Sequence, residues 1–340
     1  MPANHRRGGM MIAVLHPEGA HAAQLLRRLN LRLSQHALLS WTVGEEAPSH
    51  DIRLLLALGP VPRALLDRQP KLEIVQTMSA GYETVDVDAA SQLGIWVSNA
   101  PAGLTGNAVS VAEFAVMLLI GASRHLKSAL RSEVDSTSAV GTDARSLRGK
   151  TLCVVGLGSI GRSLVELLRP FGMKIVATDR DVSQPPEGVT LYAAAELNTA
   201  LADVDYVVIC VPGSKDNEKL INAAVLSRMK LGAILVNVAR GSVVDESALC
   251  AALRSGRISA VGLDVVRTEP VSAENPLLEF PQALVTPHIA GDTDLSMNGT
   301  VDYIVKVVQE WEGGIKPYSA INDPQTPRRT FRTAGAAGRH

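Results

Sequence analysis

Three glycines spaced as G-x-G-x-x-G constrain the fold of this 340-residue chain more than any other stretch. They are Gly156, Gly158 and Gly161, and an apolar run that starts at Thr151 leads directly into them. At this spacing the first glycine permits a tight strand-to-helix turn, and the second lets a pyrophosphate approach the backbone. The third lets the helix pack closely on the strand. The stretch therefore predicts a turn that binds a dinucleotide at a helix N-terminus.

An acidic residue follows the glycines at the distance that a dinucleotide site requires. The run Lys174 to Asp179 predicts a second strand, and Asp179 comes eighteen residues after Gly161. A carboxylate there can accept both ribose hydroxyls of NAD and would repel the additional phosphate of NADP. Arg180 leaves NADP open as the less favoured alternative. NAD is the predicted cofactor.

Strands and helices alternate along the whole chain, which favours an α/β fold with parallel sheets covered by helices on both faces. Four strands are predicted before the glycine turn, at 10–16, 52–58, 72–78 and 94–99. From the turn onward the pattern predicts the six strands of a full dinucleotide-binding sheet, at 151–156, 174–179, 205–211, 233–238, 260–264 and 283–286. The length predicts two domains.

Two long helices are predicted outside this alternation. The helix at 107–126 is apolar nearly all round, so we expect it to be buried between domains or against a partner subunit. A polar stretch at 132–148 predicts a surface connection into the glycine turn. The helix at 294–312 closes the ordered chain and is expected to return to the first unit. Residues 324–340, rich in Pro, Arg, Gly and Thr, predict a mobile tail.

Composition excludes several classes of function. A formal charge of −1 gives no reason to expect nucleic-acid binding. Apolar runs fall short of the roughly 18 residues of a membrane span, and residues 1–9 lack the apolar region of a secretory signal. The cysteines Cys153, Cys210 and Cys250 form no C-x-x-C pair, which suggests a reducing compartment. We expect a cytoplasmic protein without a metal site.

Ligands of such sheets bind beyond the carboxyl ends of the strands, so the residues just after each strand are the informative ones. In this chain they include Arg240, Asp264, Glu269 and His288. Hydride transfer between NAD and an alcohol needs a general base near neutral pH, for which a histidine is suited, and a carboxylate to orient it. It also needs a cation for the substrate's carboxylate, a role that the bidentate guanidinium of arginine fills.

Each of these residues also has a structural interpretation. His288 could be a structural hydrogen-bond partner, Arg240 a surface ion pair, Glu269 a turn residue before Pro270, and Asp264 a helix cap. Their convergence on one edge beside a cofactor turn favours the joint catalytic interpretation.

These motifs together resemble the D-isomer-specific 2-hydroxyacid dehydrogenase family, which includes glyoxylate/hydroxypyruvate reductases and phosphoglycerate dehydrogenases. The resemblance runs from about Leu72 to Tyr318. It rests on the glycine turn with Asp179 and on four further segments, namely Asn237 to Glu246, Gly262 to Val265, Glu269-Pro270 and Thr286 to Gly291.

The resemblance implies specific roles and a specific domain arrangement. Arg240, Glu269 and His288 would be the catalytic residues. Ala80, Gly81, Arg240 and His288 would bind the substrate, with Arg240 and the amides of Ala80 and Gly81 holding its carboxylate and His288 transferring the proton. The implied cofactor contacts are Gly156, Gly158, Ser159, Ile160, Gly161, Asp179, Cys210, Val211, Pro212, Val238, Ala239, Arg240, Asp264, His288 and Gly291. A Rossmann NAD-binding domain at 99–289 would be inserted in a smaller flavodoxin-like substrate domain at 1–98 and 290–323. The nucleotide domains would form a homodimer.

The resemblance implies an NAD-dependent enzyme that interconverts a small 2-oxo acid and its D-2-hydroxy acid. Two alternatives remain open: a phosphite oxidation like that of some proteins of similar fold, and an NAD-sensing scaffold without turnover, as in related co-repressors. Formate dehydrogenases share the segment that starts at Asn107, but they carry glutamine where this chain has Glu269. Glu83 replaces the family's usual aspartate, and the tryptophan often found between the long helix and the glycine turn is missing.

Overall fold

The computed structural model describes residues 11–46, 51–135 and 144–333, and its contacts divide the chain into two compact units. Unit 1 comprises residues 1–106 and 294–340, and unit 2 comprises residues 107–293. The sequence predicts the domain boundaries at 98/99 and 289/290, whereas the structure has them a few residues later, at 106/107 and 293/294. Residues 99–106 group with unit 1 because Ala100 N donates to Ser79 O and because Gly299 packs on the Thr105 backbone.

Unit 1 is built on a five-stranded, wholly parallel sheet with the order β2-β1-β3-β4-β5. The strands are β1 (Met11–His16), β2 (Leu38–Thr42), β3 (Ile52–Ala57), β4 (Ile74–Thr77) and β5 (Trp96–Ser98). The sequence did not predict β2. It is an edge strand in which only Trp41 is fully buried, so its sequence lacks the continuous apolar run of a central parallel strand.

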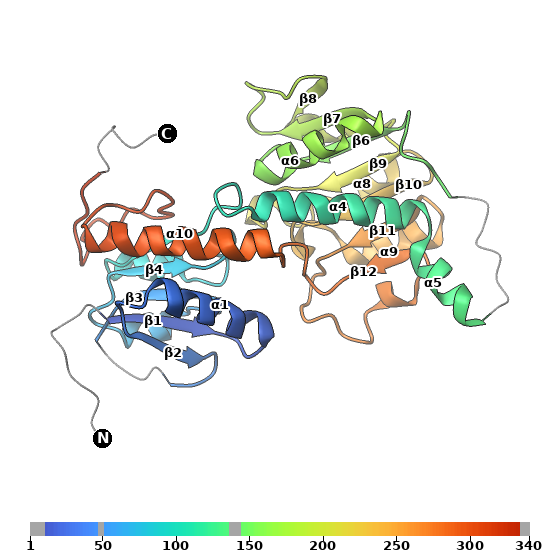
Figure 1. Cartoon of the computed structure of the whole chain (residues 1–340). Helices are drawn as coiled ribbons and strands as arrows, with labels where there is room; N and C mark the ends of the chain where they lie inside the picture. The colour runs from blue at the N-terminus through green and yellow to red at the C-terminus, as the bar shows by residue number, and fades with distance from the viewer. Residues whose placement is uncertain (1–10, 47–50, 136–143, 334–340) are drawn as a thin grey trace. The chain divides into compact units, whose positions relative to one another are not determined.

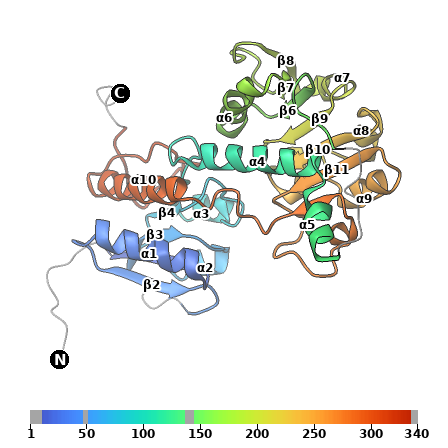
Figure 2. The same cartoon turned by 45° about the vertical axis from the view of Figure 1, so that its right-hand side comes forward.

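Helices cover both faces of this sheet (Figures 1 and 2). Alternate residues of β1 point to opposite faces. Ile12 and Val14 pack against α1 (Ala20–Arg32) and α10 (Asp294–Glu312). Ala13 and Leu15 belong to the second core, to which α2 (Arg63–Asp67) and α3 (Val87–Gln92) contribute. The predicted bounds of the helix at 294–312 are confirmed.

The segment that follows α10 packs onto unit 1, so the prediction of a mobile tail is wrong for residues 324–333. Arg329 pairs with the buried carboxylate of Glu73 at 3.0 Å, and the ring of Phe331 meets that of Trp96 edge-on at 5.8 Å. The composition of this segment suggested disorder because the side chains that anchor it, such as Arg329 and Phe331, are few. Their partners, Glu73 and Trp96, lie far away in the sequence. Residues 334–340, which the same prediction covered, lie outside the described part.

Unit 2 contains a seven-stranded parallel sheet with the order β12-β11-β10-β9-β6-β7-β8. Its strands are β6 (Thr151–Val155), β7 (Lys174–Asp179), β8 (Val189–Ala193), β9 (Tyr206–Ile209), β10 (Ala233–Asn237), β11 (Ile258–Leu263) and β12 (Ala283–Val285). All six predicted strands are present. The seventh, β8, is a partly exposed edge strand without a continuous apolar signal.

Helices lie on both faces of the larger sheet (Figures 1 and 2). One face packs on α4 (Asn107–Ser123) and α6 (Ser159–Leu168) through residues such as Val154 and Val208. The other packs on α7 (Leu197–Leu201), α8 (Ala223–Arg228) and α9 (Glu246–Arg254) through Val207 and Ile209. The fold class is therefore α/β, as predicted.

The long helix predicted at 107–126 is shorter in the structure. It ends at Ser123, because His125 takes a φ of 50° that breaks the helical backbone, and α5 (Leu126–Asp135) follows. Part of the polar stretch predicted as a surface connection is thus helical, while residues 136–143 lie outside the described part. Among the described helices, none combines the length and the apolar character needed to cross a bilayer.

Candidate active site at the carboxyl edge of the larger sheet

The glycine turn joins β6 to α6 in the geometry that its spacing predicts. Gly156 has a φ of 101°, a left-handed conformation that favours glycine. A Cβ on Gly161 would overlap the carbonyl oxygen of Gly156, so glycine is needed for α6 to approach the turn. Gly158 is the N-cap of α6, and a Cβ added there would meet no atom within 4 Å. This open space above the helix N-terminus is suited to a bound phosphate.

Asp179 at the end of β7 faces the same turn. Its Oδ2 accepts a hydrogen bond from Leu157 N at 2.6 Å, and its Oδ1 accepts one from Asp181 N at 3.0 Å. The two bonds hold the carboxylate against the glycine turn. There it could also accept hydrogen bonds from the hydroxyl groups of a ribose.

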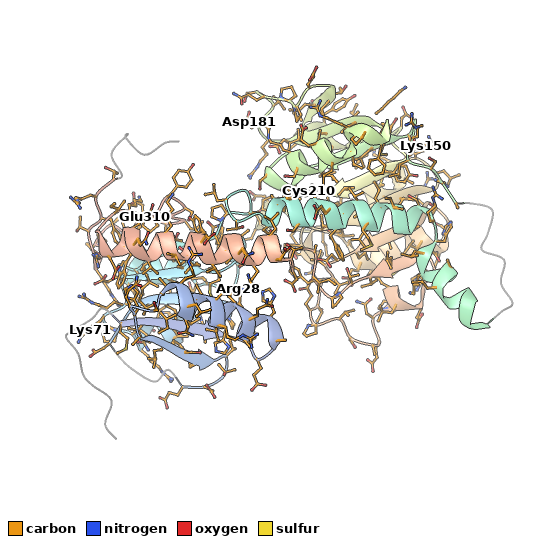
Figure 3. All side chains as sticks on the ribbon, in the orientation of Figure 1. Arg28, Lys71, Lys150, Asp181, Cys210 and Glu310 are labelled. Atoms are coloured by element: carbon orange, nitrogen blue, oxygen red, sulfur yellow. The ribbon has the colours of Figure 1, made fainter. Side chains whose placement is uncertain are left out.

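A cavity of about 260 Å³ opens beside these residues. Of the residues implied as cofactor contacts, six line it, namely Gly156, Gly158, Asp179, Cys210, Val211 and Pro212. Cys210 lies in unit 2 just after β9 (Figure 3), and burial raises the pKa of its thiol to about 12. Its thiol is therefore neutral at physiological pH and forms an apolar part of the wall.

The turn after β10 carries Arg240. The buried amide of Asn237 holds this turn, because its Nδ2 donates to Arg240 O at 2.9 Å and its Oδ1 accepts from Ala239 N at 3.0 Å. The side chain of Arg240 lies across Gly213, where a Cβ would come within 2.5 Å of Arg240 Cγ. Its Nη1 donates to Ala239 O at 2.8 Å.

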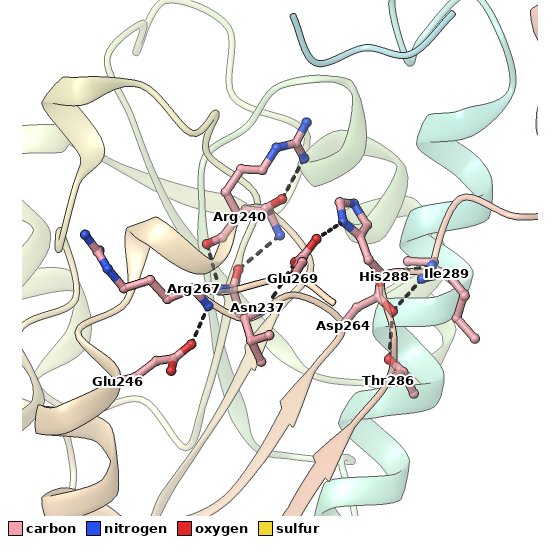
Figure 4. A network of polar contacts seen from close by, with 12 residues as sticks. Asn237, Arg240, Glu246, Asp264, Arg267, Glu269, Thr286, His288 and Ile289 are labelled. Carbon is pink, nitrogen blue, oxygen red and sulfur yellow. Dashed lines mark hydrogen bonds and ion pairs between the residues drawn. The ribbon is translucent and has the colours of Figure 1, made fainter. Parts of the chain in front are cut away.

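His288 and Glu269 form a hydrogen-bonded pair beyond β12 and β11. His288 Nδ1 lies 2.7 Å from Glu269 Oε2 (Figure 4). That hydrogen bond and the carboxylate charge raise the pKa of His288 despite partial burial, which opposes the rise. Burial likewise works against ionisation of Glu269, but the hydrogen bond and charge of His288 outweigh it and lower the pKa of Glu269. The charge of Arg240 contributes to lowering the pKa of both groups, and Figure 4 shows the three side chains close to one another.

The carboxylate of Asp264 organises the loop that carries His288. It is 1% exposed, and its two oxygens accept from Thr286 Oγ1 at 2.7 Å, Ile289 N at 3.0 Å and Ala290 N at 2.9 Å. Its backbone oxygen accepts from His288 N at 2.8 Å. The structure thus gives Asp264 a clear function in shaping the His288 loop, whereas the sequence suggested a cofactor contact or a helix cap.

The predicted substrate loop belongs to unit 1 and follows β4. Ser79 Oγ donates to Gly81 O at 2.9 Å, and Ala80 O accepts from Asn99 Nδ2 at 2.7 Å. Within the described residues, the N–H groups of Ala80 and Gly81 make no hydrogen bond. They are available to an anion.

Most of the predicted residues lie at the carboxyl ends of strands of unit 2, along one edge of its sheet. Ser159 and Ile160 are in the first turn of α6, Val238 and Ala239 follow β10, and Gly291 follows the His288 loop. These five do not line the 260 Å³ cavity. Several residues that do line it were not predicted, namely Thr178, Ala194, Leu197, Asn217 and Leu220. Ala194 and Leu197 follow the unpredicted strand β8, so their place in the site had no sequence signal.

Comparison with known proteins agrees with this architecture. Residues 116–290 match the model of the D-isomer specific 2-hydroxyacid dehydrogenase NAD-binding domain. The chain is 33% identical over 288 residues to the glyoxylate reductase of Thermococcus litoralis, covering 82% of this chain and 85% of that protein. A solved structure of an NADPH-dependent glyoxylate/hydroxypyruvate reductase from Sinorhizobium meliloti, in complex with NADP and malonate, superposes with a TM-score of 0.80. The identity is 31%, with 96% of this chain and all of that chain covered.

A D-3-phosphoglycerate dehydrogenase from Archaeoglobus fulgidus is 31% identical over 327 residues, or 95% of this chain. The chain spans 61% of the length of that relative. The match to the NAD-binding domain covers the glycine turn, Asp179, Arg240, Glu269 and His288 in one continuous segment. The chain belongs to the D-isomer specific 2-hydroxyacid dehydrogenase family.

Proposed function

We propose that this protein is an NAD-dependent oxidoreductase that interconverts a small 2-oxo acid and the corresponding D-2-hydroxy acid. The observation that carries the proposal is the His288–Glu269 pair at 2.7 Å, beside Arg240, at the ligand-binding edge of a dinucleotide-binding sheet. Relatives named glyoxylate reductase and glyoxylate/hydroxypyruvate reductase support a substrate of two or three carbons.

The residues present fit NAD. The open space at Gly158 and the N-terminus of α6 would hold the pyrophosphate, Asp179 the ribose hydroxyls, and the apolar wall of Val211 and Pro212 the adenine side of the ligand. When bound, the nicotinamide supplies or accepts a hydride. The carboxylate of Asp179 favours NAD over NADP because a 2′-phosphate would lie against a negative charge.

His288 is the proposed general acid and base. Its Nδ1 faces Glu269, and its Nε2 makes no hydrogen bond within the described residues, so Nε2 is available to a substrate oxygen. A carboxylate at Nδ1 favours the protonated imidazole, which can donate a proton from Nε2 to the oxygen of a 2-oxo acid during reduction. In the oxidative direction the neutral imidazole would accept the hydroxyl proton at the same atom.

Arg240 is the proposed anchor of the substrate carboxylate. Its guanidinium can bind a carboxylate through two parallel hydrogen bonds, which fixes the orientation of the carbonyl carbon next to it. We further propose that the N–H groups of Ala80 and Gly81, which make no hydrogen bond within the described residues, bind an anionic group of the substrate. Glu269 then acts through His288 and does not bind the substrate.

A spectrophotometric screen of NADH oxidation tests the proposed reaction. The panel contains glyoxylate, hydroxypyruvate, pyruvate and 3-phosphohydroxypyruvate, and it is repeated with NADPH and, in the oxidative direction, with phosphite and NAD. We expect turnover of at least one small 2-oxo acid, faster with NADH than with NADPH. Turnover of phosphite alone, or NADH binding without turnover of any substrate, would contradict the proposal.

We also propose a homodimer formed through α4. One face of this helix is buried in unit 2, yet Val109, Met117 and Ile120 on another face remain 37%, 38% and 38% exposed. Such an apolar stripe on a long helix is typical of a subunit contact. Replacing Met117 with Glu should shift the mass measured by light scattering from dimer to monomer, whereas Lys306→Glu on α10 should not. A wild-type monomer would contradict this assembly.

A cytoplasmic location is part of the same proposal. The three cysteines are free, and Cys153 and Cys250 are buried, as in proteins that fold in a reducing compartment.

A further inference from the structure

The position of Glu269 depends on a short loop that follows β11. One of its carboxylate oxygens, Oε2, contacts His288, and the other, Oε1, accepts from Val266 N at 3.2 Å. The loop therefore folds back onto Val266, and the next peptide, between Val266 and Arg267, continues directly from that residue. A displacement of this peptide would move the carboxylate that orients His288.

The carboxylate of Glu246 binds this same peptide. Glu246 lies in the first turn of α9, and its Oε1 accepts the backbone N–H of Arg267 (Figure 4). The helix does not need Glu246 as its cap, because Asp245 is the N-cap and its Oδ1 accepts from Ala248 N at 3.2 Å. Glu246 thus reaches away from its own helix to the loop that carries Glu269.

The same peptide also packs against Gly241. A Cβ on Gly241 would overlap the carbonyl group of Val266 and the nitrogen of Arg267, so the two backbones are in direct contact. Gly241 directly follows Arg240. The Val266–Arg267 peptide therefore contacts both the turn that carries Arg240 and the Glu246 carboxylate, which links the positions of Arg240 and Glu269.

We propose that Glu246 is a positioning residue of the acid–base pair: by holding the Val266–Arg267 peptide, its carboxylate sets where Glu269 meets His288. This inference rests on the proposed function of His288 as the general acid and base. A competing interpretation is that Glu246 only stabilises α9, since an acidic residue in the first turn interacts favourably with the helix dipole. The two interpretations differ in what a Glu246 variant does to the pH dependence of the reaction.

The test compares Glu246→Ala, Glu246→Gln and Glu218→Ala in the full-length protein. Glutamine removes the charge but retains an oxygen that can accept from Arg267 N–H. Glu218 is the matched control, because its Oε1 contacts the same residue at the side-chain Nη2, at 2.9 Å, and not at the backbone. The measured quantities are kcat and KM for the best 2-oxo acid, the pH profile of kcat/KM, and the thermal unfolding midpoint.

We expect Glu246→Ala to lower kcat/KM about tenfold, mainly through kcat, because a misplaced catalytic group is costly. The kcat/KM of reduction should decline at a lower pH in this variant than in the wild type. The reason is that His288, less well paired with Glu269, has a lower pKa. Glu246→Gln should restore both quantities to near the wild-type values, and Glu218→Ala should change neither.

Three results would overturn the inference. The first is a Glu246→Ala variant with a lower unfolding midpoint but an unchanged kcat and pH profile, as expected for a helix-stabilising residue. The second is an equal effect of alanine and glutamine, which would assign the effect to charge alone. The third is an equal effect of Glu218→Ala. A wild-type protein without turnover on any 2-oxo acid would instead count against the proposed function.

Discussion

His288 has a left-handed backbone conformation, with a φ of 56°, which few residues other than glycine adopt. Such a conformation costs about 1–3 kcal/mol and persists only where its surroundings impose it. Here Asp264 imposes it, because its carboxylate binds the N–H groups of Ile289 and Ala290 and its backbone oxygen binds His288 N. At the scale of single residues, the site depends on one histidine that two carboxylates fix: Asp264 fixes its backbone and Glu269 fixes its ring.

The Glu269 carboxylate should determine the pH range of the reaction. It raises the pKa of His288, so 2-oxo acid reduction, which needs the protonated ring, should be fast at low pH and decline as pH rises through that pKa. In Glu269→Gln the pKa of His288 should drop, and the decline should move to lower pH, with kcat/KM reduced about 10- to 100-fold near neutrality. The pH profile of kcat/KM measures both effects, and a profile identical to that of the wild type would contradict the pairing.

The His288–Glu269 pair also makes the free energy of unfolding depend on pH. The direction of this dependence follows from the pKa shifts of the two residues. The raised pKa of His288 contributes stability that is lost as pH rises through the pKa of the folded state. The lowered pKa of Glu269 contributes stability that is lost as pH falls through its own folded-state value. The pair therefore stabilises the protein between these two values.

The residues of the site could be predicted from sequence where topology alone determines their place. Arg240 and His288 each follow a strand of a parallel sheet, whose carboxyl ends share one edge. The function of Asp264 could not be predicted in the same way, because it depends on how the loop after β12 folds back onto β11. Glu246 carried no local signal either, since its partner Arg267 is 21 residues away in sequence.

At the scale of elements, the site depends on how closely α6 approaches β6. Gly161 allows this contact, and Gly158 leaves the helix N-terminus open. The two glycines thus have different functions: Gly161 allows the helix to pack on the strand, and Gly158 leaves space for a bound ligand.

Alanine substitutions should separate these contributions. Gly161→Ala forces a Cβ into the Gly156 carbonyl and should lower the free energy of unfolding by about 1–3 kcal/mol as well as weaken NADH binding. Gly158→Ala meets no chain atom and should weaken NADH binding while leaving the free energy of unfolding within about 0.5 kcal/mol of the wild type. Urea unfolding and NADH fluorescence titration measure the two quantities. Equal loss of stability in both variants would contradict this division.

The sequence did not predict the two edge strands β2 and β8, the break after α4 or the helix α5 that follows the break. Central parallel strands are buried on both faces and form continuous apolar runs, as in β9 and β10. Edge strands are partly exposed and lack that run, and their pairing with β1 and β7 is a long-range event. The break after α4 depends on one backbone angle at His125, which no periodicity indicates.

At the scale of the whole molecule, residues 324–333 complete unit 1. Glu73 is 5% exposed, and its carboxylate contacts Arg53, Arg329 and the indole Nε1 of Trp311. This cluster joins β3, the residue just before β4, α10 and the segment after α10, so the integrity of unit 1 depends on residues more than 200 positions apart.

Loss of Arg329 should weaken unit 1 in particular. Arg329→Ala leaves the buried Glu73 with fewer partners and should lower the free energy of unfolding by about 2 kcal/mol. The three tryptophans, Trp41, Trp96 and Trp311, all belong to unit 1, so tryptophan fluorescence during urea unfolding reports on this unit. Arg332→Ala is the control, because among the described residues that side chain forms a hydrogen bond with Gly313 O alone, at 2.9 Å. An equal midpoint for Arg329→Ala and the wild type would argue against the cluster's importance.

The proposed reaction requires a proton carrier at one atom, His288 Nε2, while the cofactor is bound by other residues. The most direct measurement is therefore the comparison of wild type and His288→Ala in steady-state reduction of the best 2-oxo acid, together with NADH titration of both proteins. We predict that turnover of the variant falls at least about 1,000-fold, since the loss of a general acid removes a factor of this order. Its dissociation constant for NADH should stay within about threefold of the wild-type value. A variant that binds NADH and still reduces the 2-oxo acid at the wild-type rate would contradict the assignment of His288 and the mechanism built on it.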